Sequence, residues 1–362
     1  MSDPAIETPG EARNARPVLI TGGSGFVGSN LADRLLSDGN SVLIFDNLSR
    51  EGVAGNFRWL KEKHGNAVTL IEGDIRDSRS VAQAVKQASA VFHLAAQVAV
   101  TTSLTEPEDD FAINTVGTLN VLNAIRLLPK KIPLVFTSTN KVYGKLGSLA
   151  FEKEEQRYAP SDAKIRQHGI SESQPLEFFS PYGCSKGAAD QYVLDYARTY
   201  DIPAVVFRMS CIYGPRQFGT EDQGWVAHFL IQAQKGLPIT IYGDGRQVRD
   251  ILYVGDLVEA LLLARAKATK LSGQAFNIGG GPERTVSLLE LLDLIGELEN
   301  SEVQTSFNDW RTGDQSYYVS DVSKFTAATG WKPRVEIRDG IQRLRRWLKQ
   351  EVVPSELAVE TV

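Results

Sequence analysis

The sequence predicts an α/β fold in which a doubly wound parallel sheet is joined to a smaller, mixed α/β domain. From residue 18 onward, short apolar and β-branched segments alternate with longer segments of helical spacing. This alternation is typical of a parallel sheet that is covered by helices on both faces. The short segments are almost continuously apolar, as expected for strands that are buried on both faces. After about residue 213, loops rich in Gly and Pro replace this rhythm.

The elements of the first half follow from this pattern in chain order. Helices are predicted where apolar residues recur three and four positions apart, at 25–37, 78–88, 111–128 and 186–200. Gly39 follows the first of these segments as a stop signal. In the second half, we expect a helix at 285–298 and a short return to the sheet near 249–263. The strands are predicted at 18–21, 41–46, 68–74, 90–96, 134–139 and 204–210.

These elements divide the chain into three parts. Residues 1–16 are polar, lack the apolar core of a signal peptide, and are expected to form a disordered tail. Residues 17–213, together with about 249–267, are predicted to form the sheet domain. Residues 214–248, together with about 268–350, are predicted to form the smaller domain.

The composition excludes several classes of protein. The 362 residues carry 39 Lys and Arg against 44 Asp and Glu, a net charge of −5, which argues against a nucleic-acid partner. The two cysteines, Cys184 and Cys211, cannot form a disulfide framework or a four-ligand zinc site. They fit a reducing, cytoplasmic location. The four histidines show no metal-ligand spacing, and no segment approaches the ~20 apolar residues of a membrane span. We therefore expect no metal and no membrane partner.

A glycine-rich segment follows the first predicted strand. Gly22, Gly25 and Gly28 form the pattern G-x-x-G-x-x-G, and Phe26 and Val27 open the first helix within it. Glycines there permit a tight turn, close approach of the backbone to a pyrophosphate, and close packing of helix on strand. The N-terminus of the helix directs free N–H groups at the phosphates. The segment therefore predicts a dinucleotide-binding Rossmann domain.

An acidic residue ends the second predicted strand. Asp46 lies 18 positions after Gly28 (46 − 28), where a carboxylate accepts hydrogen bonds from the adenosine ribose hydroxyls. Such a carboxylate repels a 2′-phosphate, which favours NAD over NADP. Asn47 and Arg50 are expected at the same end of the cofactor, and the positive charge of Arg50 keeps NADP as the alternative.

A tyrosine and a lysine are spaced to form a catalytic pair. Tyr182 and Lys186 lie four positions apart and therefore share one face of the predicted helix. An ammonium ~4 Å from the phenol, at an effective dielectric constant of ~20, favours the phenolate by roughly 4 kcal/mol, or about 3 pKa units. We expect this shift to make Tyr182 a working base at neutral pH. Thr139, at the end of the fifth predicted strand, completes the predicted site.

Together these motifs resemble the extended short-chain dehydrogenases/reductases, a family that includes NAD-dependent epimerases and dehydratases of nucleotide sugars. The resemblance covers roughly residues 17–350 and is strengthened by the segments 93–96, 207–216 and 249–250. It implies that the sheet domain binds NAD and that the smaller domain binds a nucleotide sugar. It also implies a homo-oligomer, either a dimer or a tetramer.

The resemblance implies a role for each matching residue. Tyr182 would take a proton from a sugar hydroxyl, Lys186 would bind the nicotinamide ribose and tune the tyrosine, and Thr139 would hydrogen-bond the reacting oxygen. Tyr182 and Lys186 thus also belong to the cofactor contacts. The other cofactor contacts that it implies are Asp74, Ile75, Leu94, Ala95, Ala96, Gln97, Asn114, Thr137 and Met209.

The resemblance also implies contacts to the substrate. Arginines are suited to a diphosphate because the planar guanidinium donates hydrogen bonds in pairs. The long stretch from Tyr143 to Tyr182, which includes His168, is expected to line or cover the sugar site. The expected substrate contacts are Thr139, Asn140, Lys141, Cys211, Gly224, Trp225, Val226, Arg249, Arg311 and Asp314.

The residues after Thr139 limit which reaction of the family this chain is expected to catalyse. Family members that dehydrate at C4–C6 carry an Asp-Glu pair there, whereas this chain has Asn140 and Lys141, so a 4,6-dehydratase is disfavoured. Segments 137–144, 180–192 and 208–226 resemble the CDP-paratose 2-epimerase group, also called CDP-tyvelose 2-epimerases. That resemblance implies an isomerase that inverts C2 of a nucleotide-linked hexose through a 2-keto sugar, with a tightly bound NAD regenerated in each turnover.

Three alternatives remain open from the sequence. A 4-epimerase would use the same scaffold, and a GDP- or UDP-hexose could replace the CDP-hexose. A non-catalytic NAD-binding sensor is the third, although such proteins usually lose the Tyr, the Lys or the Thr that this chain retains.

Overall fold

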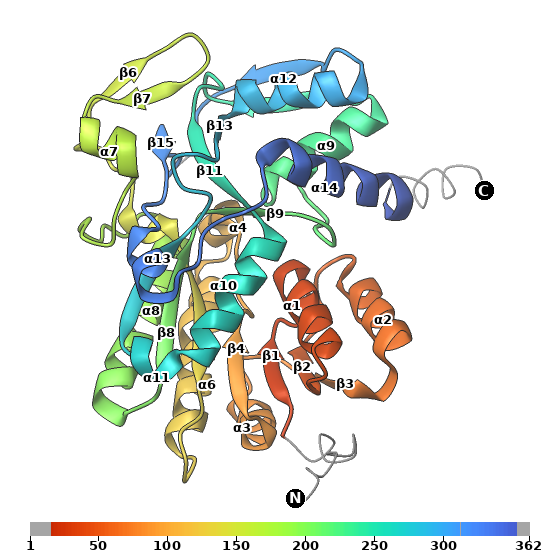
Figure 1. Ribbon diagram of the computed structural model, residues 1–362, viewed down its shortest axis with the longest axis vertical. Coiled ribbons are helices and arrows are strands. Elements are labelled where there is room, and N and C mark those ends of the chain that lie inside the picture. Colours follow the sequence, from red (N-terminus) through yellow and green to blue (C-terminus); the bar gives the residue numbers. More distant parts are fainter. Residues whose placement is uncertain (1–15, 312, 353–362) are drawn as a thin grey trace, which may run out of the picture.

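A seven-stranded parallel sheet forms the centre of the protein in the computed structural model, which describes residues 16–311 and 313–352 (Figure 1). Every pair of neighbouring strands is parallel. The predicted doubly wound α/β fold is thereby confirmed. The strands lie in the order β12 (Gln274–Ile278), β8 (Ala204–Met209), β5 (Leu134–Thr139), β4 (Ala90–His93), β1 (Val18–Thr21), β2 (Val42–Asp46) and β3 (Val68–Glu72).

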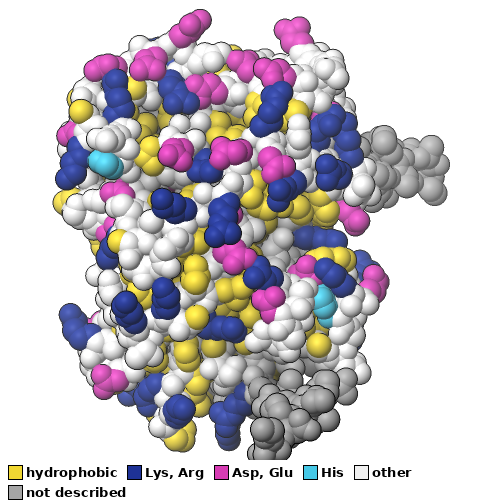
Figure 2. Space-filling view, in the orientation of Figure 1, with side chains coloured by type: hydrophobic (Ala, Val, Ile, Leu, Met, Phe, Trp, Pro, Cys, Tyr) yellow, Lys and Arg dark blue, Asp and Glu magenta, His cyan; other side chains and the backbone are white. Residues whose placement is uncertain are grey.

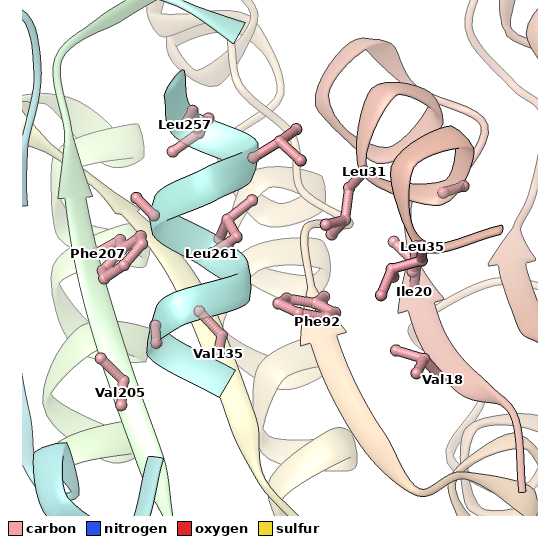
Figure 3. Packing of buried hydrophobic residues seen from close by; sticks show 14 of the residues in the cluster. Val18, Ile20, Leu31, Leu35, Phe92, Val135, Val205, Phe207, Leu257 and Leu261 are labelled. Atoms are coloured by element: carbon pink, nitrogen blue, oxygen red, sulfur yellow. The ribbon is translucent and has the colours of Figure 1, made fainter. Parts of the chain in front are cut away.

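Helices cover both faces of this sheet because alternate strand residues point to opposite sides. Val18 and Ile20 pack against the first group of helices, whereas Leu19 packs against the second. Figure 3 shows Leu31 of the first helix lying over the first of these faces. The first group is α1 (Phe26–Ser37), α2 (Val53–His64), α10 (Val254–Ala266), α11 (Ala268–Leu271) and α13 (Ser323–Thr329). The second group is α3 (Ser78–Gln87), α6 (Gly117–Arg126) and α8 (Ser180–Tyr200).

Short helical segments connect the main elements. The chain between β4 and α6 contains α4 (Val100–Thr105), α5 (Pro107–Phe111) and a π-helical turn (Ala112–Val116). Single 3₁₀ turns are formed by Gly65–Ala67 and, directly after β5, by Asn140–Tyr143. The segment after this second turn forms the hairpin β6 (Phe151–Lys153) and β7 (Tyr158–Pro160), followed by α7 (Ala163–His168).

The smaller domain has its own sheet and its own apolar core. Val226, Leu291 and Leu344 belong to this core, one from each of its three helices. The helices are α9 (Trp225–Lys235), α12 (Leu288–Glu299) and α14 (Ile337–Glu351). The sheet consists of β13 (Thr285–Ser287), β11 (Val248–Tyr253) and β15 (Tyr317–Tyr318), with β9 (Cys211–Tyr213) also paired to β11, and a separate pair joins β10 (Ile239–Tyr242) to β14 (Thr305–Asn308).

Two sequence-based expectations are wrong in detail. The return to the main sheet expected near 249–263 occurs later, at β12. β11 pairs instead with β9, β13 and β15, although Leu252 of β11 and the helix α10 pack against the main sheet. The helix expected to begin at Lys186 begins at Ser180, because Pro181 occupies its first turn, a position that proline favours. The tail expected at 1–16 lies outside the described residues except for Arg16.

The strand order places the site. It reverses at β1, which has β2 on one side and β4 on the other, and ligands of such sheets bind beyond the carboxyl ends of the strands at this point. Figure 2 shows that basic and acidic side chains are interspersed over the visible face, with apolar side chains between them. Among the described residues, no helix combines the length and apolar character that a membrane span requires.

Candidate active site

The glycine loop between β1 and α1 is tightly packed. A Cβ on Gly22, whose φ is +69°, would lie 2.7 Å from the backbone N of Ala95, and one on Gly28 would lie 2.3 Å from the Gly22 carbonyl oxygen. Both positions therefore require glycine. The Gly22 carbonyl oxygen is also the one atom recorded within 4 Å of a Cβ built on Gly25, and no side chain caps α1. The first-turn N–H groups, including those of Phe26 and Val27, thus have no side-chain acceptor, an arrangement that suits the binding of a pyrophosphate.

Asp46 at the end of β2 is fixed beside this loop. Its Oδ2 accepts a hydrogen bond from the Ser24 backbone N–H at 3.0 Å, and its Oδ1 accepts one from the Leu48 N–H at 2.9 Å. Burial raises the pKa of the carboxyl group, while these backbone hydrogen bonds act in the opposite direction. The nearby Arg50 donates to the side-chain oxygen of Gln223, which belongs to the loop before α9. These positions suit the ribose end of a dinucleotide.

The loop after β4 is linked to α8 through Asn114. The Asn114 Oδ1 accepts from the Gln97 backbone N–H at 3.0 Å, and its Nδ2 donates to Asp110 at 3.1 Å and to Ser185 of α8 at 3.0 Å. Asn114 is buried and fully hydrogen-bonded, so it positions both segments. The other expected cofactor residues of this loop, Leu94, Ala95 and Ala96, lie between Gln97 and β4.

The two expected cofactor residues that follow β3 have different surroundings. Asp74 forms an ion pair with Arg76 at 2.7 Å, and the hydrogen bonds from Arg76 lower the pKa of its carboxyl group. The Ile75 side chain is buried in the core, and its carbonyl oxygen accepts from Asn120 at 3.0 Å. Asn47 follows β2, and its side chain also helps to lower the pKa of the Asp74 carboxyl group.

The three expected catalytic residues lie together and are buried. Thr139 ends β5, Tyr182 lies in the first turn of α8, and Lys186 lies one turn later, with 8%, 8% and 3% of their surfaces exposed. The Lys186 ammonium donates a hydrogen bond to the carbonyl oxygen of Thr137 at 2.7 Å. Met209, the last residue of β8, is paired in register with Thr139.

The expected lowering of the Tyr182 pKa by Lys186 is wrong for this structure. Burial raises the pKa of Tyr182 to about 12, and the Asp110 charge raises it further, while the hydrogen bond with Thr139 lowers it. The Lys186 ammonium is directed to Thr137, and burial lowers its own pKa to about 8. Desolvation therefore outweighs the attraction that the helical spacing suggested.

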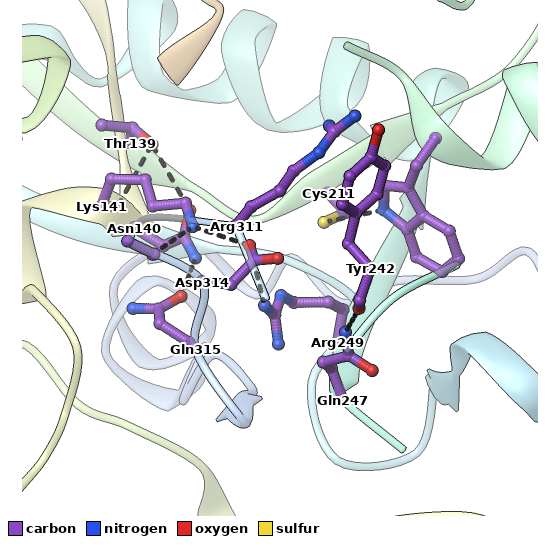
Figure 4. Close-up of polar contacts among 12 residues, drawn as sticks. Thr139, Asn140, Lys141, Cys211, Tyr242, Gln247, Arg249, Arg311, Asp314 and Gln315 are labelled. Atoms are coloured by element: carbon purple, nitrogen blue, oxygen red, sulfur yellow. Dashed lines mark hydrogen bonds and ion pairs between the residues drawn. The ribbon is translucent and has the colours of Figure 1, made fainter. Parts of the chain in front are cut away.

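A second group of polar residues lies next to Thr139, on the side of the smaller domain (Figure 4). Lys141 Nζ donates to the Gly313 carbonyl oxygen at 3.1 Å and lies 3.8 Å from Asp314 Oδ1. Arg249 Nη2 lies 3.9 Å from the same oxygen, and Arg249 is only 8% exposed. Lys141, Arg249 and Asp314 are named below the cation cluster.

The other expected substrate residues surround this cluster. Arg311 stacks on Tyr242 with 3.8 Å between the guanidinium carbon and the ring centroid, and it donates to the Glu221 carbonyl and carboxylate oxygens at 2.9 and 3.1 Å. The Trp225 indole donates to Cys211 Sγ at 3.4 Å, and burial raises the pKa of that thiol. Gly224 precedes α9 with a φ of +77°, whereas the Val226 side chain is buried in the core of the smaller domain.

Sequence reasoning missed two buried groups near the site. Gln315 is fully buried, accepts from Asn140 Nδ2 at 3.2 Å and donates to the Gly144 carbonyl oxygen at 2.6 Å. It lies in an irregular segment that offers no sequence signal. Asp190 forms two hydrogen bonds of 2.9 Å with Arg208, which fix α8 to β8. Its position one turn after Lys186 could have revealed it. In 16–311 and 313–352, no group of His, Cys, Asp and Glu could hold a metal.

Comparisons with known proteins agree with this geometry. Residues 19–344 match the sequence family described as GDP-mannose 4,6 dehydratase. A CDP-paratose 2-epimerase from Salmonella typhi is 44% identical over 337 residues, which are 91% of this chain and 98% of that protein. The crystal structure of a Thermus thermophilus UDP-glucose 4-epimerase in complex with NAD is similar with a TM-score of 0.77 and 32% identity, over 93% of this chain and 100% of that one.

A further similar structure contains a nucleotide sugar as well as NAD. The UDP-glucuronic acid 4-epimerase from Bacillus cereus, in complex with UDP-glucuronic acid and NAD, has a TM-score of 0.79 and 26% identity, over 92% of this chain and 99% of that one. The expected family and cofactor class are thereby confirmed. The chain belongs to the GDP-mannose 4,6 dehydratase family, within the extended short-chain dehydrogenases/reductases that comprise NAD-dependent epimerases and dehydratases.

Proposed function

We propose that the protein is an isomerase that inverts C2 of a CDP-linked hexose of the paratose/tyvelose type, with NAD as its cofactor. The observation that carries the proposal is that Thr139 and Tyr182 are buried together while Asn140 and Lys141, rather than carboxylates, follow Thr139. Elimination of water requires a positioned acid and base, which these two residues do not supply. The 44% identical CDP-paratose 2-epimerase supports C2 as the centre and CDP as the nucleotide.

The cofactor residues fit NAD. The glycine loop and the uncapped N-terminus of α1 suit its pyrophosphate, and the fixed carboxylate of Asp46 suits its ribose hydroxyls. When bound there, NAD would supply reversible acceptance of a hydride from the sugar. Arg50 is engaged by Gln223, which favours NAD over a cofactor that needs a cation for a 2′-phosphate.

The residues of the chain then remove and return one proton, that of the C2 hydroxyl of the sugar. Tyr182 takes the proton of the C2 hydroxyl as its phenolate. Burial raises the pKa of Tyr182 to about 12 and so disfavours that form, whereas the positive charge of a bound NAD⁺ would favour it. Thr139 hydrogen-bonds the same oxygen, and burial of both side chains keeps water from the reacting carbon. Lys186 spends one N–H on the Thr137 carbonyl oxygen, which leaves its charge and its remaining protons for the ribose of the cofactor. After the 2-keto sugar has presented its other face, Tyr182 returns the proton.

Two relatives with different reactions define the alternatives. UDP-glucose 4-epimerase and UDP-glucuronic acid 4-epimerase are 32% and 26% identical to this chain, so inversion at C4 and a UDP-hexose are the outcomes that compete with the proposal. We also propose that the protein forms a homo-oligomer and is located in the cytoplasm.

Proton NMR of the purified protein with CDP-, GDP- and UDP-hexoses in D₂O tests the proposal. We expect CDP-paratose to show a change of the H1–H2 coupling from the gluco to the manno type, with no deuterium at C2. A change of the H3–H4 coupling instead would make the protein a 4-epimerase. Solvent deuterium in the product would show that the carbon is inverted by deprotonation rather than by hydride transfer.

A further inference from the structure

Lys141 follows Thr139 by two residues, and its backbone lies against the start of α8. Its backbone N–H donates to Thr139 Oγ1 at 3.2 Å, so the chain turns back sharply after β5. Its carbonyl oxygen lies 3.4 Å from the place where a Cβ on Gly183 would be, directly after Tyr182. The backbone of Lys141 is thus packed between the end of β5 and the first turn of α8.

The charges of the cation cluster are incompletely matched. Asp314 lies between the two cations, with its Oδ1 3.8 Å from Lys141 Nζ and 3.9 Å from Arg249 Nη2. Both distances are too long for hydrogen bonds. The hydrogen bonds recorded for the two cationic groups go to backbone carbonyls, Lys141 Nζ to Gly313 and Arg249 Nη1 to Val248. One carboxylate against two cations leaves an excess positive charge and unused N–H donors beside Thr139.

This excess fits an anion with several oxygen atoms. Arg and Lys side chains with free donors in a mostly buried setting bind phosphate groups through charge-assisted hydrogen bonds. Burial and the Arg249 charge lower the pKa of Lys141, whereas Asp314 raises it. A bound phosphate would therefore complete the electrostatics of this cluster.

The chemistry of the sugar says which phosphate should lie there. In a nucleotide hexose, C1 carries the diphosphate, C2 is its direct neighbour, and C4 lies on the opposite side of the ring. When C2 is the reacting carbon beside Tyr182 and Thr139, the sugar-proximal phosphate must lie close to those residues. When C4 reacts, that phosphate lies farther away. A cation placed two residues after Thr139 serves the first arrangement.

We propose that Lys141 binds the sugar-proximal phosphate and thereby places C2, rather than C4, against Tyr182. Lys141 is then a residue that determines which carbon reacts, and Asp314 keeps Lys141 and Arg249 close together in spite of their like charges. The inference rests on the proposed 2-epimerase function and names how the site achieves it.

Isothermal titration calorimetry of the NAD-loaded protein tests this role, with CDP and CMP as probes. CDP has the sugar-proximal phosphate and CMP lacks it. For Lys141→Met, we expect the affinity for CDP to fall by about 10- to 100-fold, the loss of one hydrogen-bonded charge pair, while CMP binding stays nearly unchanged. Lys141→Gln, which keeps polarity without charge, should behave alike, and Lys141→Arg should restore most of the CDP affinity.

Lys86→Met provides the matched control, because Lys86 lies exposed on α3 and its loss should change neither affinity. The inference is overturned if the affinities for CDP and CMP fall together, or if CDP binding by Lys141→Met and Lys141→Gln equals that of the wild type. The NMR assay tests the proposed function independently of the calorimetry. If the proposed function is wrong, the wild-type protein inverts C4 in that assay.

Discussion

The cofactor half and the substrate half of the site hold their polar groups in different ways. On the cofactor side, Asp46 accepts two backbone hydrogen bonds. The side chain of Asn114 accepts a hydrogen bond through its oxygen and donates two through its nitrogen. Next to it, Lys186 is fixed on a strand carbonyl at 2.7 Å. On the substrate side, Asp314 approaches its two cations only to 3.8 and 3.9 Å.

The difference indicates which part of the site is complete before ligands arrive. Hydrogen-bonded, buried groups on regular strands and helices hold the catalytic geometry, which favours reaction because the groups need no reorganisation. The loosely paired charges of the cation cluster come from the turn after β5, from β11 and from the loop before β15, and they retain donors for a ligand. We therefore expect this cluster, rather than the pre-formed half, to distinguish one substrate and one reacting carbon from another.

The largest expected effect concerns the base in the pre-formed half. Tyr182→Phe removes the proton acceptor, and we expect turnover to fall by about 10²- to 10⁴-fold while NAD remains bound. Steady-state rates with CDP-paratose and the NAD content of the purified variant measure the two effects. Tyr192→Phe is the matched control on the same helix, because Tyr192 is 44% exposed and should retain full activity. Nearly normal turnover of Tyr182→Phe would contradict the assignment.

The next largest effect concerns the buried pair that fixes the catalytic helix. Asp190→Asn leaves the Arg208 guanidinium buried without its counter-charge, and both side chains are at most 6% exposed. We expect the free energy of unfolding to fall by about 3–5 kcal/mol, measured by urea denaturation. Asp195→Asn breaks the exposed pair with Arg198 on the same helix and should cost at most about 1 kcal/mol. Equal losses in the two variants would show that α8 does not depend on the buried pair.

A smaller, pH-dependent effect is expected at His93, where β4 ends. Burial lowers the pKa of His93 to about 3 from its usual 6.5, so below pH 6.5 the unfolded chain binds a proton that the folded chain does not. Stability must therefore fall as the pH drops through this range, by about 2 kcal/mol between neutrality and pH 5. His93→Gln should lack this part of the pH dependence, and His168→Gln, at an exposed site, should retain it. An unchanged slope in His93→Gln, measured by urea denaturation at several pH values, would exclude this origin.

The smallest effect on stability is expected in the loosely paired half. Asp314→Asn removes a carboxylate that lies beyond hydrogen-bond distance of both of its cations, and its side chain is 28% exposed. We expect the free energy of unfolding to change by less than about 1 kcal/mol, although Asp190→Asn removes the same charge. A loss as large as that of Asp190→Asn would erase the distinction between the two halves.

Much of the sheet domain could be predicted because six of its seven strands carry their own signal. The runs at β1 and β5 are apolar and β-branched, and their bounds agree with the structure. β12 was missed because its sequence, QAFNI, has polar residues. It also lies beyond residue 267, where the sheet domain was predicted to end. β11 has the stronger apolar pattern, but its pairing partners are set by tertiary contacts that periodicity does not encode.

The identities of the site residues were easier to predict than their electrostatics. Helical spacing brought Tyr182 and Lys186 to one face of α8, yet it could not show that Lys186 is directed to the Thr137 carbonyl or that burial raises the pKa of Tyr182. Gln315 and the geometry of Asp314 depend on irregular loops, whose backbone paths follow from packing rather than from local pattern.

The central claim is that the hydrogen removed from C2 returns to C2 of the same molecule. CDP-paratose carrying deuterium at C2, incubated with the protein in H₂O together with an equal amount of ¹³C-labelled, undeuterated CDP-paratose, tests it by mass spectrometry. We expect all deuterium to remain at C2 of the product, without transfer to the ¹³C-labelled pool or to water. Deuterium that is lost to water, or that appears in the ¹³C-labelled product, would contradict inversion by a retained hydride within one closed site.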